Sequence, residues 1–157
     1  MRFKAKLASE QVQLLYSLIG PISRLTSVAV LYLDPQHMRL STRDGSGDGI
    51  ICFAELSTIR GIFLEHRCES AADNVILFEI DLTQWRMALY SVLGGGDARR
   101  KKVDDDQIPM GESSITTFKL AKRHGGLPCL CLDAQCSSGV DVHHAIPVRI
   151  MRAADMQ

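Results

Sequence analysis

The sequence lacks an excess of charge, a long apolar run and a secretion signal. Lysine plus arginine and aspartate plus glutamate each total 18 among 157 residues, so no net charge attracts the whole molecule to nucleic acid or to a membrane. No apolar run approaches the ~20 residues that span a bilayer, and the opening residues Met1–Lys6 lack the apolar core of a signal peptide. The five cysteines are an odd number, which argues against a disulfide framework. These absences predict an intracellular chain with no membrane partner.

Motifs of catalysis and cofactor binding are also missing. The sequence contains no Gly-x-Ser-x-Gly elbow, no phosphate-binding loop and no dinucleotide fingerprint. Cys129, Cys131 and Cys136 are residue types that bind zinc, but a Cys-x-Cys pair on a strand directs both thiols to one face, which suits a tetrahedral site poorly. We therefore expect no enzyme activity, no catalytic residue, no metal and no cofactor.

Apolar residues at helical spacing predict two amphipathic helices. The first covers residues 9–26 and is interrupted by Pro21, because proline lacks an N–H and crowds the preceding turn. The second covers residues 81–93, where Asp81 is the expected N-cap and Gly94 can supply a left-handed stop.

Between and after these helices, short apolar runs alternate with turn residues and predict about nine strands. The expected strands cover residues 2–7, 28–33, 37–43, 50–56, 62–68, 75–81, 115–122, 127–133 and 142–151. Two helices cannot cover both faces of so much sheet. We therefore expect an α+β fold in which both helices pack on one face of antiparallel sheets.

A charged loop is expected inside this domain rather than at a domain boundary. Residues 94–113 begin with three glycines and contain the basic run Arg99–Lys102 and the acidic run Asp104–Asp106. This composition is typical of a mobile, solvated loop, and too little chain follows it to build a second core, so residues 1–157 are expected to form one domain. The basic run could contact phosphates or act as a nuclear address, or it could be solvated only.

Residues 44–55 resemble a calcium-binding loop and carry the alternative function. Asp44, Ser46, Asp48 and Glu55 stand at positions 1, 3, 5 and 12 of an EF-hand pattern. The upstream residues 37–43 alternate like a strand, however, whereas an EF-hand needs an entering helix. A glycine-rich hairpin turn is the other interpretation of this segment.

Four stretches of the chain together resemble a known family. They are Met1-Arg2-Phe3-Lys4-Ala5-Lys6, Leu31-Tyr32-Leu33-Asp34-Pro35-Gln36-His37-Met38, Leu127-Pro128-Cys129-Leu130 and His144-Ala145-Ile146-Pro147-Val148-Arg149-Ile150. In this order, over essentially the whole chain, they are similar to the Hus subunit of the DNA-damage checkpoint clamp, a relative of the replication sliding clamp. The order of strands and helices in that family's N-terminal domain matches the order predicted above.

The resemblance implies a sliding-clamp (PCNA-like) domain in a non-enzymatic, nuclear subunit. Such a subunit joins two other clamp subunits in a heterotrimer, meets a checkpoint clamp loader, encircles duplex DNA without sequence specificity and supports checkpoint signalling and DNA repair. Subunits of this family have two clamp domains. The chain therefore resembles the first domain only, and a clamp subunit or a truncated form of one is expected.

The resemblance also implies site residues. The two helices would line the central hole, which makes Arg24 and Arg86 the cations nearest to DNA. Further DNA-binding candidates at the rim are Arg99, Arg100, Lys101 and Lys102. The last strand would be an edge strand that extends a neighbour's sheet, with Val142, His144, Ile146, Val148 and Ile150 as interface candidates.

Overall fold

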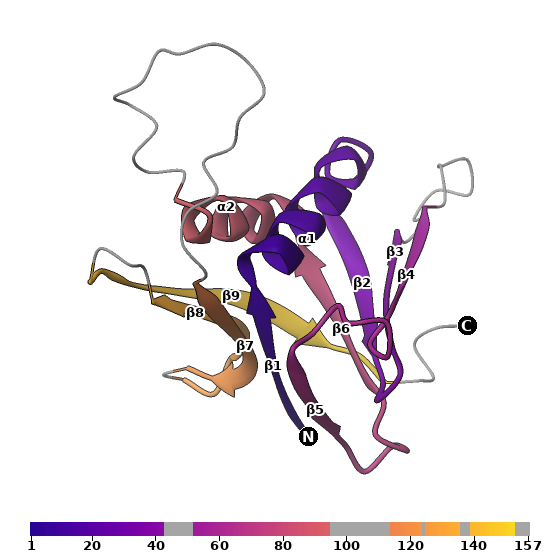
Figure 1. Cartoon of the computed structure of the whole chain (residues 1–157). Helices are drawn as coiled ribbons and strands as arrows, with labels where there is room; N and C mark the ends of the chain where they lie inside the picture. Colours follow the sequence, from indigo (N-terminus) through magenta and orange to yellow (C-terminus); the bar gives the residue numbers. More distant parts are fainter. Residues whose placement is uncertain (43–51, 95–113, 124, 136–138, 153–157) are drawn as a thin grey trace.

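Nine strands and two helices form the computed structural model, which describes residues 1–42, 52–94, 114–123, 125–135 and 139–152 (Figure 1). In chain order the elements are β1 (Arg2–Ala8), α1 (Ser9–Ile22), β2 (Val28–Leu33), β3 (His37–Thr42), β4 (Phe53–Ser57), β5 (Glu65–Glu69), β6 (Ile76–Asp81), α2 (Leu82–Val92), β7 (Ile115–Lys122), β8 (Pro128–Gln135) and β9 (Asp141–Ile150). The predicted α+β order of elements is confirmed.

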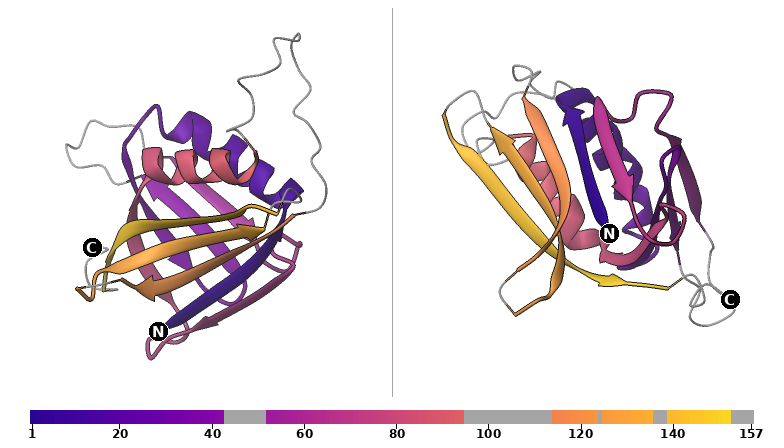
Figure 2. Two further views of the ribbon diagram at one scale, coloured as in Figure 1. Left: turned by 90° about the vertical axis from the view of Figure 1, so that its left-hand side faces the viewer. Right: turned by 90° about the horizontal axis from the view of Figure 1, so that it is seen from below.

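All strand pairs are antiparallel and form one nine-stranded sheet in the order β4-β3-β2-β6-β9-β8-β7-β1-β5. β9 joins the two halves of this sheet, because Asp141–Pro147 pairs with β8 and Val148–Ile150 pairs with β6. The halves turn their inner faces toward each other, and both helices lie together along the same side (Figures 1 and 2). The predicted placement of both helices on one face is therefore confirmed.

The core lies between the inner faces of the sheet and the two helices. Phe3, Ala5 and Leu7 alternate with cations along β1 and are buried, as the period of two predicts. Trp85 of α2 is fully buried in the same cluster as Leu15 of α1. Burial of a large apolar side chain contributes roughly 2 to 3 kcal/mol, so these contacts attach both helices firmly to the sheet.

The C-terminal end of α1 differs from the prediction. The helix begins at Ser9, as predicted, and the Gln11 side-chain oxygen accepts a hydrogen bond from the Ala8 N–H at 2.6 Å. It ends at Ile22, one residue after Pro21, rather than at residue 26. The proline removes one helical donor, and the chain continues as a turn in which the Leu25 N–H donates to the Ile22 carbonyl.

Both ends of α2 agree with the prediction. The Asp81 carboxylate accepts the Gln84 N–H at 2.8 Å, as an aspartate N-cap does. Gly94 follows the helix with a φ of +84°, a left-handed conformation that favours glycine. Within the described ranges, no helix has both the length and the apolar character needed to cross a membrane.

Two predicted strands are displaced along the chain. The run 50–56 becomes β4 at Phe53–Ser57, and the run 62–68 becomes β5 at Glu65–Glu69. Ile62 and Phe63 precede β5 and are nevertheless buried. An apolar run predicts burial more reliably than it predicts strand pairing, and here the buried residues belong to the connection between the two strands.

Candidate assembly and DNA-facing surfaces

The outer side of the two helices is the face that, by the resemblance to the clamp family, would meet DNA. α1 and α2 lie side by side (Figure 1) and are joined by aromatic contacts. The rings of Tyr16 and Tyr90 have centroids 6.0 Å apart, and the guanidinium of Arg86 lies 5.4 Å from the Tyr16 centroid. Arg86 is thereby held over an aromatic face, a favourable cation–π arrangement.

This helix layer carries little charge. Glu10 is the charged residue of α1 and Arg86 is the charged residue of α2. The exposed side chains include apolar ones, since Leu14 is 51% exposed and Met87 is 68% exposed. The two helices therefore produce a weak electrostatic field, so a polyanion in front of them would be held loosely.

Of the predicted DNA-binding cations, the structure describes Arg24 and Arg86, and these two do not contact each other. Arg24 is exposed and lies in the turn after α1, and no described contact joins it to Arg86. Arg99, Arg100, Lys101 and Lys102 lie outside the described residues. Tyr16, which sequence analysis did not select, is the residue that positions Arg86. In the sequence, Tyr16 was recognisable only as an aromatic residue with a polar group at the border of the apolar face of the helix.

The prediction of β9 as an edge strand over its whole length is wrong. Val148 and Ile150 lie opposite Ile80 and Phe78 of β6, inside the sheet. Val142, His144 and Ile146 pair with β8, and no described strand pairs with β9 along that half. The difference arises because β9 crosses from one half of the sheet to the other, which a single strand pattern cannot reveal.

The open side of β9 can be assigned from hydrogen-bond alternation. The Met151 N–H donates to the Leu77 carbonyl at 2.9 Å, so odd-numbered residues direct their backbone groups to the side where β6 lies. Along the first half of β9, His143 and Ala145 therefore present their N–H and carbonyl groups away from β8. Pro147 has no N–H and ends this row of donors.

The strands at the two ends of the sheet differ in how well they resist pairing. β5 places Glu65, Arg67 and Glu69 in alternation on its outward face, and charged residues of this kind discourage edge-to-edge pairing. On β4, Glu55 is the charged residue, and Phe53 is 62% exposed. β4 and the first half of β9 are thus the two least protected pairing edges among the described strands.

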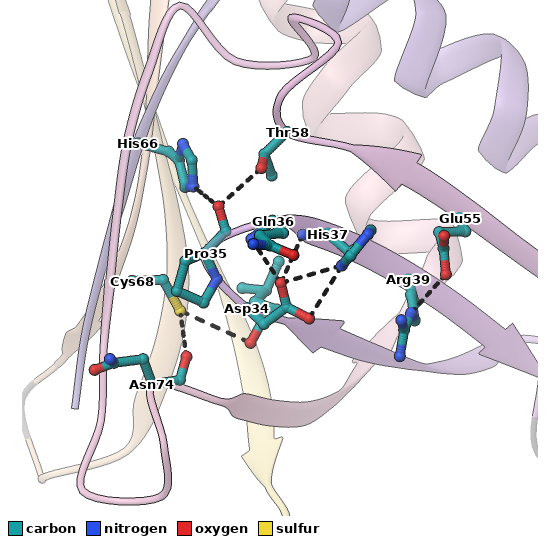
Figure 3. Close-up of polar contacts among 11 residues, drawn as sticks. Asp34, Pro35, Gln36, His37, Arg39, Glu55, Thr58, His66, Cys68 and Asn74 are labelled. Carbon is teal, nitrogen blue, oxygen red and sulfur yellow. Dashed lines mark hydrogen bonds and ion pairs between the residues drawn. The ribbon is translucent and has the colours of Figure 1, made fainter.

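The turn between β2 and β3 is tied to both ends of the sheet (Figure 3). The Asp34 carboxylate accepts the N–H groups of Gln36 at 2.6 Å and His37 at 2.7 Å. Burial alone would raise the pKa of Asp34, but the hydrogen bonds from these N–H groups outweigh it and hold the pKa below its ordinary value. The carbonyl of Pro35 accepts hydrogen bonds from Thr58 Oγ1 at 2.9 Å and from His66 Nε2 at 2.8 Å.

Cys68 of β5 lies beside the same turn (Figure 3). Its thiol donates to the Asn74 carbonyl, with the two atoms 3.1 Å apart. Burial, helped by the nearby Asp34 carboxylate, raises the pKa of Cys68 to about 11. The thiol is therefore protonated at neutral pH and has a structural role rather than a nucleophilic one.

The calcium-binding alternative finds no support in the structure. β3 precedes the proposed loop and β4 includes its last residues, and the two strands pair as a hairpin, whereas an EF-hand requires a helix on each side of its loop. The Glu55 carboxylate accepts a hydrogen bond from Arg39 Nε at 2.6 Å. Asp44, Ser46 and Asp48 lie outside the described residues. Among the described residues, no group of acidic, histidine or cysteine side chains could hold a metal ion.

The order of elements and the bridging strand β9 define the class of this protein. Two helices on one face of a nine-stranded antiparallel sheet form a sliding-clamp domain of the PCNA-like type. The family model described as "Hus1-like protein" matches residues 1–157, and the chain belongs to this family. The chain is also 26% identical over 156 residues to the "Checkpoint protein hus1 homolog" of Dictyostelium discoideum. That match covers 99% of this chain and 51% of the relative, so the chain spans about half the length of the curated relative it matches.

Proposed function

We propose that this chain is the first clamp domain of a non-enzymatic DNA-damage checkpoint clamp subunit. In this role it joins other clamp subunits in a heterotrimeric ring around duplex DNA, where a checkpoint clamp loader places it, and it acts in checkpoint signalling and repair in the nucleus. Membership of the Hus1-like family and the printed name of the Dictyostelium relative support the checkpoint role. The open half of β9 is the observation that supports assembly.

Assembly would use main-chain pairing at the open half of β9. His143 and Ala145 present unpaired backbone donors and acceptors there, and an incoming antiparallel strand can satisfy them. Pro147 limits the pairing to the strand's first half, because it offers no donor beyond Ala145. The exposed edge of β4 offers a second place where another clamp domain can add a strand.

Contact with DNA would be weak and independent of sequence. Arg86 can offer its outer N–H groups to phosphates while Tyr16 holds it in place, and Arg24 adds a second cation at the end of α1. The residues Arg99–Lys102 are further candidates. Because the helix layer carries so little charge, we propose that the ring surrounds DNA without binding it tightly.

The assembly proposal can be tested with one substitution and a matched control. Ala145→Pro removes the N–H on the open side of β9 without removing a hydrogen bond to β8, whereas Ala145→Val keeps that N–H. Tagged chains are purified from their native cells, and the co-purifying proteins are identified by mass spectrometry. We expect clamp subunits to accompany the unchanged chain and the valine variant, and to be lost from the proline variant. A proline variant that folds and still brings clamp subunits contradicts the proposal.

A further inference from the structure

Three cations stand side by side on the outward face of the sheet half that contains β1. Lys4 of β1 lies directly opposite Arg67 of β5 on one side and opposite Lys119 of β7 on the other. Their neighbours along each strand point inward and are buried or partly buried, so all three side chains project to the outside, away from the helices. The left view of Figure 2 faces these strands. We call Arg67, Lys4 and Lys119 the cationic row.

The ion pairs around the cationic row neutralise its two ends and leave its centre unpaired. Arg67 Nε donates to Glu69 at 2.6 Å, and Lys119 Nζ donates to Asp133 at 2.5 Å. Lys4 forms no salt bridge with any described residue, although it is exposed. The Lys4 charge helps to lower the pKa of the Glu65 carboxyl, but Glu65 pairs directly with Lys6 at 2.8 Å, so the central cation can still meet an external anion.

Like charges directly opposite one another destabilise a sheet, and here two such pairs share one residue. The chain as a whole is electrically neutral, so this repulsion is a local feature and does not follow from its composition. An anion bound over Lys4 would be attracted mainly by Lys4, because Glu69 and Asp133 already offset the charges of Arg67 and Lys119, and it would relieve the repulsion that remains between the three cations.

The dimensions of the row indicate the kind of anion. Strands are about 4.8 Å apart, so the three residues cover about 10 Å, and alternate side chains of an extended peptide are about 7 Å apart. Two acidic side chains about 7 Å apart on one face of a peptide can thus both lie within the row, which covers about 10 Å. Beyond Lys119 the row continues with the uncharged Cys131 and Ala145. Along β1 the next outward cation after Lys4 is Lys6, which already pairs with Glu65 at 2.8 Å. A nucleic acid that crosses the strands along the row therefore meets no further cation beyond Lys119, although its affinity would depend on many successive phosphate contacts.

From this register and charge pattern, we propose that the cationic row is a docking site for a short acidic segment of a protein partner. The segment lies extended across β5, β1 and β7 on the outward face of this half of the sheet. Its acidic side chains, at alternate positions, contact Lys4 and its two neighbours. This site is separate from the edges proposed for clamp assembly and from the helix layer proposed to face DNA.

The test uses a fluorescent peptide of alternating glutamate and serine as the probe, with fluorescence anisotropy as the readout. We expect binding at low salt that weakens as salt is raised. Lys4→Glu should reduce affinity by at least tenfold. Lys122→Glu is the matched control, because it makes the same change of charge at an exposed position of β7 outside the row, and it should change affinity less than threefold.

Each other outcome overturns the proposal. No peptide binding at low salt, or an equal loss in the two variants, would show that the row does not recognise acidic peptides. A single-stranded or duplex oligonucleotide of the same charge that binds more tightly than the peptide, and depends on Lys4, would assign the surface to nucleic acid instead. Circular dichroism of both variants confirms that each is folded before binding is compared.

Discussion

His66 Nε2 donates a hydrogen bond to the carbonyl of Pro35 at 2.8 Å and so connects two strands that lie far apart in the sheet order. His66 belongs to β5 at one end of the sheet, and Pro35 lies in the turn beside β3 near the other end (Figure 3). Thr58 donates to the same carbonyl, which places the connection between β4 and β5 in the same contact. The two halves of the sheet are thus fastened at this turn as well as along β9.

Loss of the His66 N–H donor should weaken the connection between the two halves of the sheet. His66→Phe keeps a ring that can contact Phe63, whose ring centroid is 5.6 Å from that of His66, and it removes the N–H. We expect the free energy of unfolding in urea to fall by about 1 kcal/mol, the usual contribution of one hydrogen bond. His66→Gln, which can still donate, is the control. Equal stability of the phenylalanine variant and the unchanged chain would show that the bond contributes nothing.

Acid should weaken the fold partly through Asp34. Because folding lowers the pKa of this carboxyl, its stabilising contribution is present above the unfolded pKa of about 3.9 and is lost as pH falls through the lower, folded value. Asp34→Asn can still accept the Gln36 and His37 N–H groups but cannot titrate. We expect its unfolding free energy to decline less than that of the unchanged chain from pH 5 downward. Parallel curves for the two proteins would contradict this assignment.

Asp133 should show the same sign of pH dependence for a different reason. Burial tends to raise its pKa, but hydrogen bonds from His143 and Lys119 hold the pKa below its ordinary value. Asp133→Asn should therefore also flatten the acid limb of the stability curve, and it should weaken the pairing with Lys119. Chemical denaturation at a series of pH values measures both effects. If the unfolding free energy of this variant falls at low pH as steeply as that of the unchanged chain, Asp133 does not contribute to the acid sensitivity.

Reversal of the charge at Lys4 should stabilise the domain. A glutamate at this position would lie between Arg67 and Lys119, and two unfavourable cross-strand pairs would become favourable ones. We expect a gain of about 0.5 kcal/mol at low ionic strength, which declines as salt is added because the residues are exposed. Thermal melting in low and high salt provides the measurement. A loss of stability in Lys4→Glu would mean that these side chains avoid one another in the folded protein.

The proposed contact of Arg86 with DNA can be tested in the complex that co-purifies with the chain. Arg86→Glu should weaken binding to unrelated duplex sequences to a similar degree and reduce the slope of log affinity against log salt by about 1. Arg86→Lys, which keeps the charge but not the planar contact with Tyr16, should retain the slope. Duplex binding that is the same in all three proteins would exclude this residue from the DNA contact.

The parts of the fold that depend on local chemistry were predictable from the sequence. The helix after Asp81 begins where the capping residue stands and ends before Gly94, because both signals act within one turn of the helix. The alternation of Phe3, Ala5 and Leu7 correctly identified the inward face of β1.

The parts that depend on distant pairing were not predictable in this way. The sequence identified β9 as a strand but could not show that Val148 pairs with β6, since its partner Ile80 lies 68 positions earlier. The cationic row has the same origin, because Lys4, Arg67 and Lys119 become neighbours only through strand register. Single-residue patterns contain no information about register between segments that are far apart in the chain.

β9 connects the proposed docking edge of the domain with its hydrophobic core. The residues that would receive a neighbouring chain continue without a break into Val148, which is 8% exposed and packs in the core. A neighbouring strand that pairs with the first half of β9, as proposed above, would therefore also stabilise the backbone of the core. By the same continuity, a substitution that disrupts the core around Val148 is expected to weaken that proposed pairing.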